Sequence, residues 1–260
     1  MNIFIESDFD LSASLRECEL APFLLLADGC QGIAGHNPSA FLDKHLEKNW
    51  LQIYSFSDEF KTSIYLVKKY YVLHKPYGYL SQFSDEAKHK GLKHLIDVEP
   101  DVYPAGRLDV DSEGLLILTN DNNLKHHLLN PQNKHNRTYH IQVDGTATSV
   151  HLNLLRQGVE ITIEGKPYKT LPPQAVNLLN EVFYPERMPP VRFRKNIPTS
   201  WIEMVLIEGK NRQVRKMTAA VGIPTLRLIR SKIEAIDIKD YKECELKELS
   251  QQEIYELLKL

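Results

Sequence analysis

The stretch of residues 103–120 constrains the fold of this chain more than any other part of the sequence. It reads Tyr-Pro-Ala-Gly-Arg-Leu-Asp-Val-Asp-Ser-Glu-Gly-Leu-Leu-Ile-Leu-Thr-Asn. Its first half contains a tight Gly-Arg-Leu-Asp turn that delivers the carboxylate of Asp109, and its second half enters the apolar run 115–118. An apolar run bounded by turn residues predicts a buried strand. A carboxylate held on a rigid element beside a cation can act as a nucleophile or as an acid or base.

The rest of the chain contains many strand-like segments and a few helix-like ones. Alternating or β-branched patterns predict strands at 65–74, 137–144, 174–182, 201–207 and 225–238. Apolar spacing of three and four residues, Gly or Pro stops and a Ser-Gln-Gln-Glu capping box predict helices at 91–96, 122–129, 150–156, 211–221 and 251–260. This combination predicts an α+β fold with a mixed, mostly antiparallel β-sheet flanked by helices.

Composition and charge exclude several classes of protein. No apolar run approaches the ~20 residues of a membrane span, and the start of the chain is no secretory signal. The cysteines at 18, 30 and 244 are odd in number and far apart, which argues against a disulfide framework or a zinc site and favours a reducing cytoplasm. The formal net charge is −2, but residues 186–232 contain eleven basic and three acidic side chains. Such a basic segment is either an ordinary solvated surface or a site that binds phosphates.

The character of the sequence changes near residue 63. Residues 1–63 are acidic, contain three loosely spaced glycines and show a helical pattern only around residues 39–49. They predict an N-terminal extension or small domain of unknown role. Residues 64–260 contain the Asp109 string and the further motifs described below. They predict a second, catalytic domain that ends in the C-terminal helix.

The residues that begin at Asp109 also imitate a calcium-binding EF-hand loop, because acidic side chains occupy its first, third and fifth positions. The imitation ends at the twelfth position, which is Asn120 instead of a bidentate Glu. The apolar residues 115–118 at positions seven to ten belong in a sheet core. We therefore expect no metal site here.

Two further motifs follow in order along the chain. The first is Arg137-Thr-Tyr139, and the second, at residues 207–217, reads Ile-Glu-Gly-Lys-Asn-Arg-Gln-Val-Arg-Lys-Met. With the Asp109 string and the Lys-Pro-Tyr-Gly sequence at 75–78, they resemble the motifs of the pseudouridine synthases, in the RsuA branch that modifies ribosomal RNA. The resemblance covers roughly residues 65–236. It implies the pseudouridine synthase fold and the isomerisation of specific RNA uridines, without cofactor or metal.

The resemblance implies roles for three residues. Asp109 corresponds to the catalytic carboxylate, which attacks the ribose or the base or removes a sugar proton. Tyr139 corresponds to the active-site tyrosine that stacks on the flipped base near the carbon that loses a proton. Arg215 corresponds to the cation that ion-pairs with the catalytic Asp and keeps it charged. A core aromatic at Tyr139 and a basic surface helix around Arg215 are the alternatives.

Further basic residues are candidates for contacts with RNA. Arg107 resembles the family arginine that fills the space vacated by the flipped uridine. The remaining candidates are expected to neutralise phosphates: Lys210, Arg212, Lys216, Arg227 and Arg230.

The target RNA is suggested by two strings, at residues 192–200 and 225–230, and by the lack of a clear S4-type RNA-binding domain in residues 1–63. These features resemble the large-subunit members of the family, which implies a uridine of 23S ribosomal RNA as the target. A uridine of 16S ribosomal RNA or tRNA is the alternative substrate, and a non-catalytic rRNA-binding assembly factor is the alternative function. The family resemblance also implies a monomer in the cytoplasm, with ribosomal RNA as the partner and no membrane association.

Overall fold

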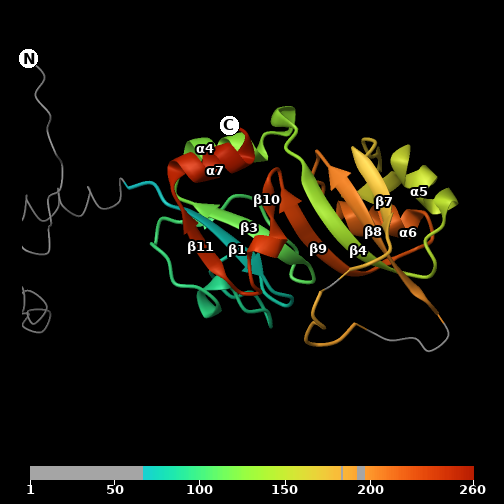
Figure 1. The fold of residues 1–260 in the computed structure, drawn as a ribbon, viewed down its shortest axis with the longest axis horizontal. Helices are drawn as coiled ribbons and strands as arrows, with labels where there is room; N and C mark the ends of the chain where they lie inside the picture. Colours follow the sequence, from blue (N-terminus) through green and yellow to red (C-terminus); the bar gives the residue numbers. More distant parts are fainter. Residues whose placement is uncertain (1–66, 183, 192–196) are drawn as a thin grey trace, which may run out of the picture. The chain divides into compact units, whose positions relative to one another are not determined.

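The computed structural model describes residues 67–182, 184–191 and 197–260 (Figure 1). The predictions for residues 1–63, the domain boundary that follows them and part of the basic string at 192–200 lie outside these residues. Within the described ranges, no helix combines the length and the apolar character needed to cross a membrane.

A nine-stranded sheet organises the described part of the chain, with the main strand order β11-β1-β3-β9-β4-β8-β7. The pairings are antiparallel except for the parallel pair of β3 and β9. The sheet strands are β1 (Tyr70–Lys75), β2 (Tyr103–Pro104), β3 (Glu113–Thr119), β4 (Arg137–Asp144), β7 (Ala175–Leu179), β8 (Thr199–Leu206), β9 (Thr225–Ile233), β10 (Ile236–Asp237) and β11 (Leu246–Leu249). The predicted mixed, mostly antiparallel α+β architecture is confirmed.

Four α-helices cover this sheet in the described residues, in two pairs near its two ends (Figure 1). α4 (Asn122–Leu129) and α7 (Gln251–Leu258) pack with β1 and β3, whereas α5 (Ser149–Arg156) and α6 (Gln213–Ala220) pack with β4, β7 and β8. Short 3₁₀ turns complete the helical elements: η2 (Leu92–His94), η3 (Pro131–Asn133) and η4 (Ile238–Asp240). The predicted capping box at Ser250 and Glu253 opens α7, and each side chain bonds the backbone N–H of the other residue.

The register of the central strands places the candidate catalytic elements on one face of the sheet. β3 is buried along its whole length, as its apolar sequence predicted. Gly114 on β3 pairs with Arg230 on β9, and Arg230 pairs with Tyr139 on β4. Directly paired residues point to the same side of a sheet. Tyr139 and Arg230 therefore lie on the face that α6 covers, where Met217 packs with Ile141 of β4.

One local prediction was wrong, and two elements were missed. The segment 225–238 is not one strand, because the chain reverses at Glu234, whose φ is 49°, and returns as β10. The hairpin of β5 (Glu160–Ile163) and β6 (Lys166–Lys169) was not predicted. The edge strand β11 was also missed, because it is short and half of its residues are exposed charges.

Candidate active site

The backbone of the Asp109 turn is held by hydrogen bonds from the loop after β1. The hydroxyl of Ser81 donates to the carbonyl of Leu108 at 2.8 Å and accepts from its N–H at 2.9 Å. The N–H of Gly78 donates to the carbonyl of Val110 at 2.8 Å. These bonds flank Asp109 on both sides, so the position of its carboxylate is set by the backbone and not by a flexible loop.

Gly114 joins this turn to the sheet. Its φ is +109°, and a Cβ added there would lie 2.3 Å from the carbonyl oxygen of Arg230. Only glycine combines this backbone conformation with so close an approach to the neighbouring strand. The Gly that ends the Asp-Ser-Glu-Gly string is therefore required by the geometry of the β3–β9 contact.

Two arginines from the start of α6 meet the two aspartates of the turn. Arg212 makes a bidentate pair with Asp111, with N···O distances of 3.0 and 2.7 Å, and its Nη1 lies 3.6 Å from a carboxylate oxygen of Asp109. Nε of Arg215 lies 3.4 Å from Oδ2 of Asp111, and its Nη2 donates to the backbone carbonyl of Asp111 at 2.6 Å. The expected ion pair between Arg215 and Asp109 is not made in the described structure. Arg212 is the arginine that pairs with Asp109.

The charges of this cluster determine its protonation. Burial acts to raise the pKa of Asp111, but the hydrogen bonds from Arg212 and the charge of Arg215 outweigh it, so the pKa is lowered. Burial lowers the pKa of Arg215, and the charges of Asp111 and Asp109 oppose that effect. An arginine remains protonated under these conditions. The site at neutral pH therefore contains two guanidinium groups beside an ionised Asp111.

Tyr139 lies half-buried on β4, opposite Arg230 in the register of the sheet. The side chain of Arg230 is buried, and its Nε donates to the carbonyl of Leu115 at 2.7 Å. Burial lowers the pKa of Arg230, while a hydrogen bond with the side chain of Tyr139 acts in the opposite direction. Tyr139 thus packs against the core beneath α6 on one side and against a fixed cation on the other.

The predicted RNA-binding residues separate into exposed and buried groups. Arg107, Lys210 and Arg212 are exposed, and Lys216 is half-buried on α6. The prediction was wrong for Arg227 and Arg230, which are 7% and 5% exposed and cannot neutralise RNA phosphates. Each lies on β9, whose two neighbouring strands leave it little surface.

Arg227 instead forms a buried ion pair with Glu113, the residue that opens β3. Its Nη2 lies 2.6 Å from Oε2 of Glu113 and its Nε lies 2.9 Å from Oε1. Glu113 and Asp111, two of the carboxylates in the calcium-loop pattern, are therefore both paired with arginines. Across the described residues, no group of three or more His, Cys, Asp or Glu side chains is arranged to hold a metal ion.

Lys75, the last residue of β1, is a buried cation to which the sequence analysis gave no role. It is fully buried, and its Nζ donates to the carbonyls of Pro76 at 2.9 Å and Tyr79 at 2.8 Å. Burial lowers its pKa to about 7, although the charge of Glu113 acts to raise it. The available signal was its place at the head of the Lys-Pro-Tyr-Gly sequence, immediately before the loop that holds the Asp109 turn.

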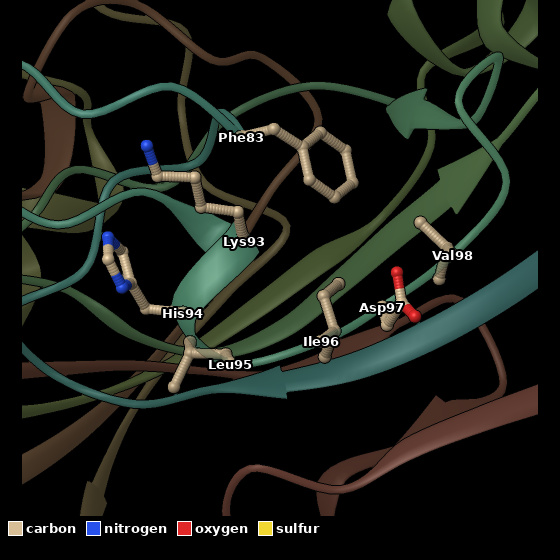
Figure 2. Close-up of a pocket in the computed structure, with 7 residues that line it drawn as sticks. All are labelled: Phe83, Lys93, His94, Leu95, Ile96, Asp97 and Val98. Atoms are coloured by element: carbon tan, nitrogen blue, oxygen red, sulfur yellow. The ribbon is translucent and has the colours of Figure 1, made fainter. Parts of the chain in front are cut away.

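A pocket of about 410 Å³ lies apart from these residues, around η2 (Figure 2). It is lined by Phe83, Lys93, His94, Leu95, Ile96, Asp97 and Val98. None of the predicted site residues lines it. Asp85 contacts two residues of the pocket lining: its carboxylate pairs with Lys93 at 2.9 Å and with His94 at 3.0 Å.

Comparisons with known proteins agree on one family. The family model described as RNA pseudouridylate synthase matches residues 69–220. The chain is 46% identical over 195 residues to ribosomal large subunit pseudouridine synthase E of Vibrio vulnificus, covering 75% of this chain and 81% of that protein. It is 50% identical over 162 residues to the protein of the same name from Xanthomonas axonopodis pv. citri, covering 61% of this chain and 82% of that protein. A crystal structure of a pseudouridylate synthase matches with a TM-score of 0.59 and 25% identity, covering 74% of each chain.

Proposed function

The chain belongs to the RNA pseudouridylate synthase family, and from that premise we propose that the Asp109 turn is the centre where uridine is isomerised. The observation that carries the proposal is the rigid turn that holds the Asp109 carboxylate 3.6 Å from Arg212. The uridine is flipped out of its stack to reach this carboxylate. Asp109 then promotes cleavage of the glycosidic bond, either as a nucleophile or by removing a sugar proton.

The neighbouring residues have separate tasks in this proposal. Arg212 supplies a positive charge 3.6 Å from the carboxylate of Asp109. Arg215 fixes the turn through the backbone carbonyl of Asp111. Tyr139 stacks on the displaced base while the base rotates. The base then forms its new bond to the ribose through carbon, and that carbon loses its proton. Arg107, exposed two residues before Asp109, occupies the space that the flipped uridine leaves in the RNA stem.

We assign the target to a uridine of 23S ribosomal RNA. The support is the name and the identity of the Vibrio vulnificus and Xanthomonas axonopodis relatives, which are large-subunit enzymes. Exposed Lys210 and half-buried Lys216 supply the cations for the RNA backbone in this assignment. The protein acts in the cytoplasm, as a monomer, and its reaction uses no cofactor or metal.

The test is a map of pseudouridines in ribosomal RNA and tRNA from cells that lack this gene, read by carbodiimide-dependent reverse-transcription stops. We expect the loss of one signal in 23S ribosomal RNA, restored by the wild-type gene and not by Asp109→Asn. The matched control is Asp240→Asn, which makes the same chemical change on exposed η4 and should restore the signal.

In vitro, Asp109→Asn should lower kcat on the target RNA by about 10⁴–10⁶-fold, as expected for the loss of a group that acts in the chemical step. RNA affinity should stay within about threefold of wild type, because the cations supply the binding energy. Product formation by Asp109→Asn at a near-normal rate would overturn the assignment. A lost signal in 16S ribosomal RNA or tRNA would overturn the target, and RNA binding without any product would favour an assembly factor.

A further inference from the structure

Arg187, in the segment between β7 and β8, lies over a residue of the active-site loop. Its guanidinium carbon is 3.9 Å from the centre of the Tyr77 ring. Tyr77 precedes Gly78, whose N–H bonds the carbonyl of Val110 beside Asp109. Arg187 therefore belongs to the surroundings of the Asp109 turn, although more than 75 residues separate the two in sequence.

The donors of Arg187 are not satisfied by the protein. Its Nε and Nη1 are buried and have no hydrogen-bond partner within the described residues. No ion pair joins this guanidinium to a carboxylate of the same residues. A buried donor without an acceptor is costly and is rare in native structures. The unpaired donors of Arg187 thus indicate an acceptor that the described residues do not supply.

The position of Arg187 is constrained by the contacts of the residues that precede it. The carbonyl of Pro185 accepts a 2.8 Å hydrogen bond from Arg227, which the buried pair with Glu113 holds in place. The hydroxyl of Tyr184 lies 2.7 Å from Nδ1 of His140, and its ring lies 5.7 Å from that of Trp201. These contacts end two residues before Arg187. They fix the backbone from which the side chain of Arg187 reaches the ring of Tyr77.

We propose that Arg187 is a substrate-binding residue that binds a phosphodiester next to the flipped uridine. This proposal rests on the function proposed above. The stack on Tyr77 uses the face of the guanidinium and leaves its Nε and Nη1 donors unpaired, and guanidinium N–H groups match the oxygens of a phosphate in pairs. The acceptor is an anion, because Arg187 carries a charge that no carboxylate of the described residues balances. The stack on Tyr77 places this anion beside the turn that presents Asp109, where the backbone of a flipped nucleotide must pass.

The test compares the full-length wild-type protein with Arg187→Ala and Arg187→Lys on an RNA stem that contains the target uridine. Three RNAs are used: the native stem, and stems with one uncharged methylphosphonate on the 5′ or the 3′ side of the target uridine. Single-turnover kcat/KM and equilibrium Kd are measured for each pair. Lys239→Ala, which removes a cation from exposed η4, is the matched control. Thermal melting confirms that each variant is folded.

We expect Arg187→Ala to lower kcat/KM and RNA affinity on the native stem by about 10- to 100-fold, the range of a lost charge-assisted hydrogen bond. Arg187→Lys keeps the positive charge but not the paired N–H groups of the guanidinium, so its loss of kcat/KM and RNA affinity should be smaller. For the wild type, one methylphosphonate stem should show a similar loss, and on that stem Arg187→Ala should lose no more than about twofold. Lys239→Ala should match the wild type throughout.

Two results overturn the proposal. One is an Arg187→Ala variant within twofold of wild type in both kcat/KM and Kd on the native stem. The other is a loss from Arg187→Ala that multiplies with the loss from each methylphosphonate, because independent effects show that neither phosphate is the partner. A wild-type protein that binds the stem but forms no pseudouridine contradicts the proposed function instead. The Kd comparison then still decides whether Arg187 contacts the phosphate.

Discussion

The buried ammonium of Lys75 makes the stability of this protein rise with pH, whereas a lysine whose pKa is raised by an ion pair makes stability fall as the pH rises. The pKa of Lys75 falls from 10.5 to about 7, mainly because of burial. At ~1.36 kcal/mol per pKa unit, the folded state holds this proton about 5 kcal/mol more weakly than the unfolded chain. Below pH 7 both states are protonated and the full cost is present. Between pH 7 and pH 10.5 only the unfolded chain keeps the proton, so the free energy of unfolding rises with pH.

Lys75→Met isolates this contribution. The difference in unfolding free energy, wild type minus variant, should increase by about 3.5 kcal/mol between pH 7 and pH 10. The variant also leaves the carbonyls of Pro76 and Tyr79 without a donor. That loss costs about 1–3 kcal/mol for each group and is independent of pH. It therefore shifts the difference in unfolding free energy by the same amount at every pH and does not change how that difference varies with pH.

The measurement is urea unfolding of both proteins at pH 7, 8, 9 and 10, with the difference taken at each pH. Other titrating groups, such as the tyrosines, are common to both proteins and cancel. A difference that stays flat within ~0.5 kcal/mol across this range would refute the reasoning. It would mean that the folded protein accommodates the charged ammonium as well as water does.

Two further predictions concern the start of β3. Glu113→Gln leaves the buried guanidinium of Arg227 without its counter-charge, so we expect urea unfolding to show a loss of about 3–5 kcal/mol; a loss below ~1 kcal/mol would contradict a desolvated pair. Gly114→Ala forces a Cβ against the carbonyl of Arg230 at a strained φ, which should cost about 2–4 kcal/mol and lower activity by displacing the Asp109 turn. Gly145→Ala, at φ +100° with open space around it, is its control and should show only the smaller backbone cost without loss of activity.

The parts of this fold that could be predicted from sequence are those whose signals are local. β4 has the predicted bounds because its apolar and polar residues alternate over eight positions. The Asp109 turn and buried β3 follow from one continuous string. The β5–β6 hairpin was missed because its turn is Glu164-Gly165, both with positive φ. Hairpin turns of this kind usually carry Asn or Asp in the first position.

The burial of Arg227 and Arg230 depended on the order of the strands, which the sequence pattern does not contain. Both residues lie in a strand rich in charged and polar side chains, which is typical of a strand with one face in water. β9 instead lies between β3 and β4, and each arginine finds a partner on β3: the Glu113 carboxylate for Arg227 and the Leu115 carbonyl for Arg230. A cation whose hydrogen bonds are supplied by a neighbouring strand can be buried, and that neighbour is known only from the fold.

The different contacts of Arg212 and Arg215 in the active site could not be predicted from the sequence either. The motif predicts that a cation from α6 reaches the catalytic turn, and two cations do so, although only Arg215 lies within the helix. Arg212 precedes α6 in the left-handed conformation, with φ 52° and ψ 33°, and its 41% exposed side chain turns back to both carboxylates. Arg215, 13% exposed, reaches the backbone of Asp111. The backbone angle at one residue thus decides which arginine supplies charge to Asp109 and which maintains the shape of the turn.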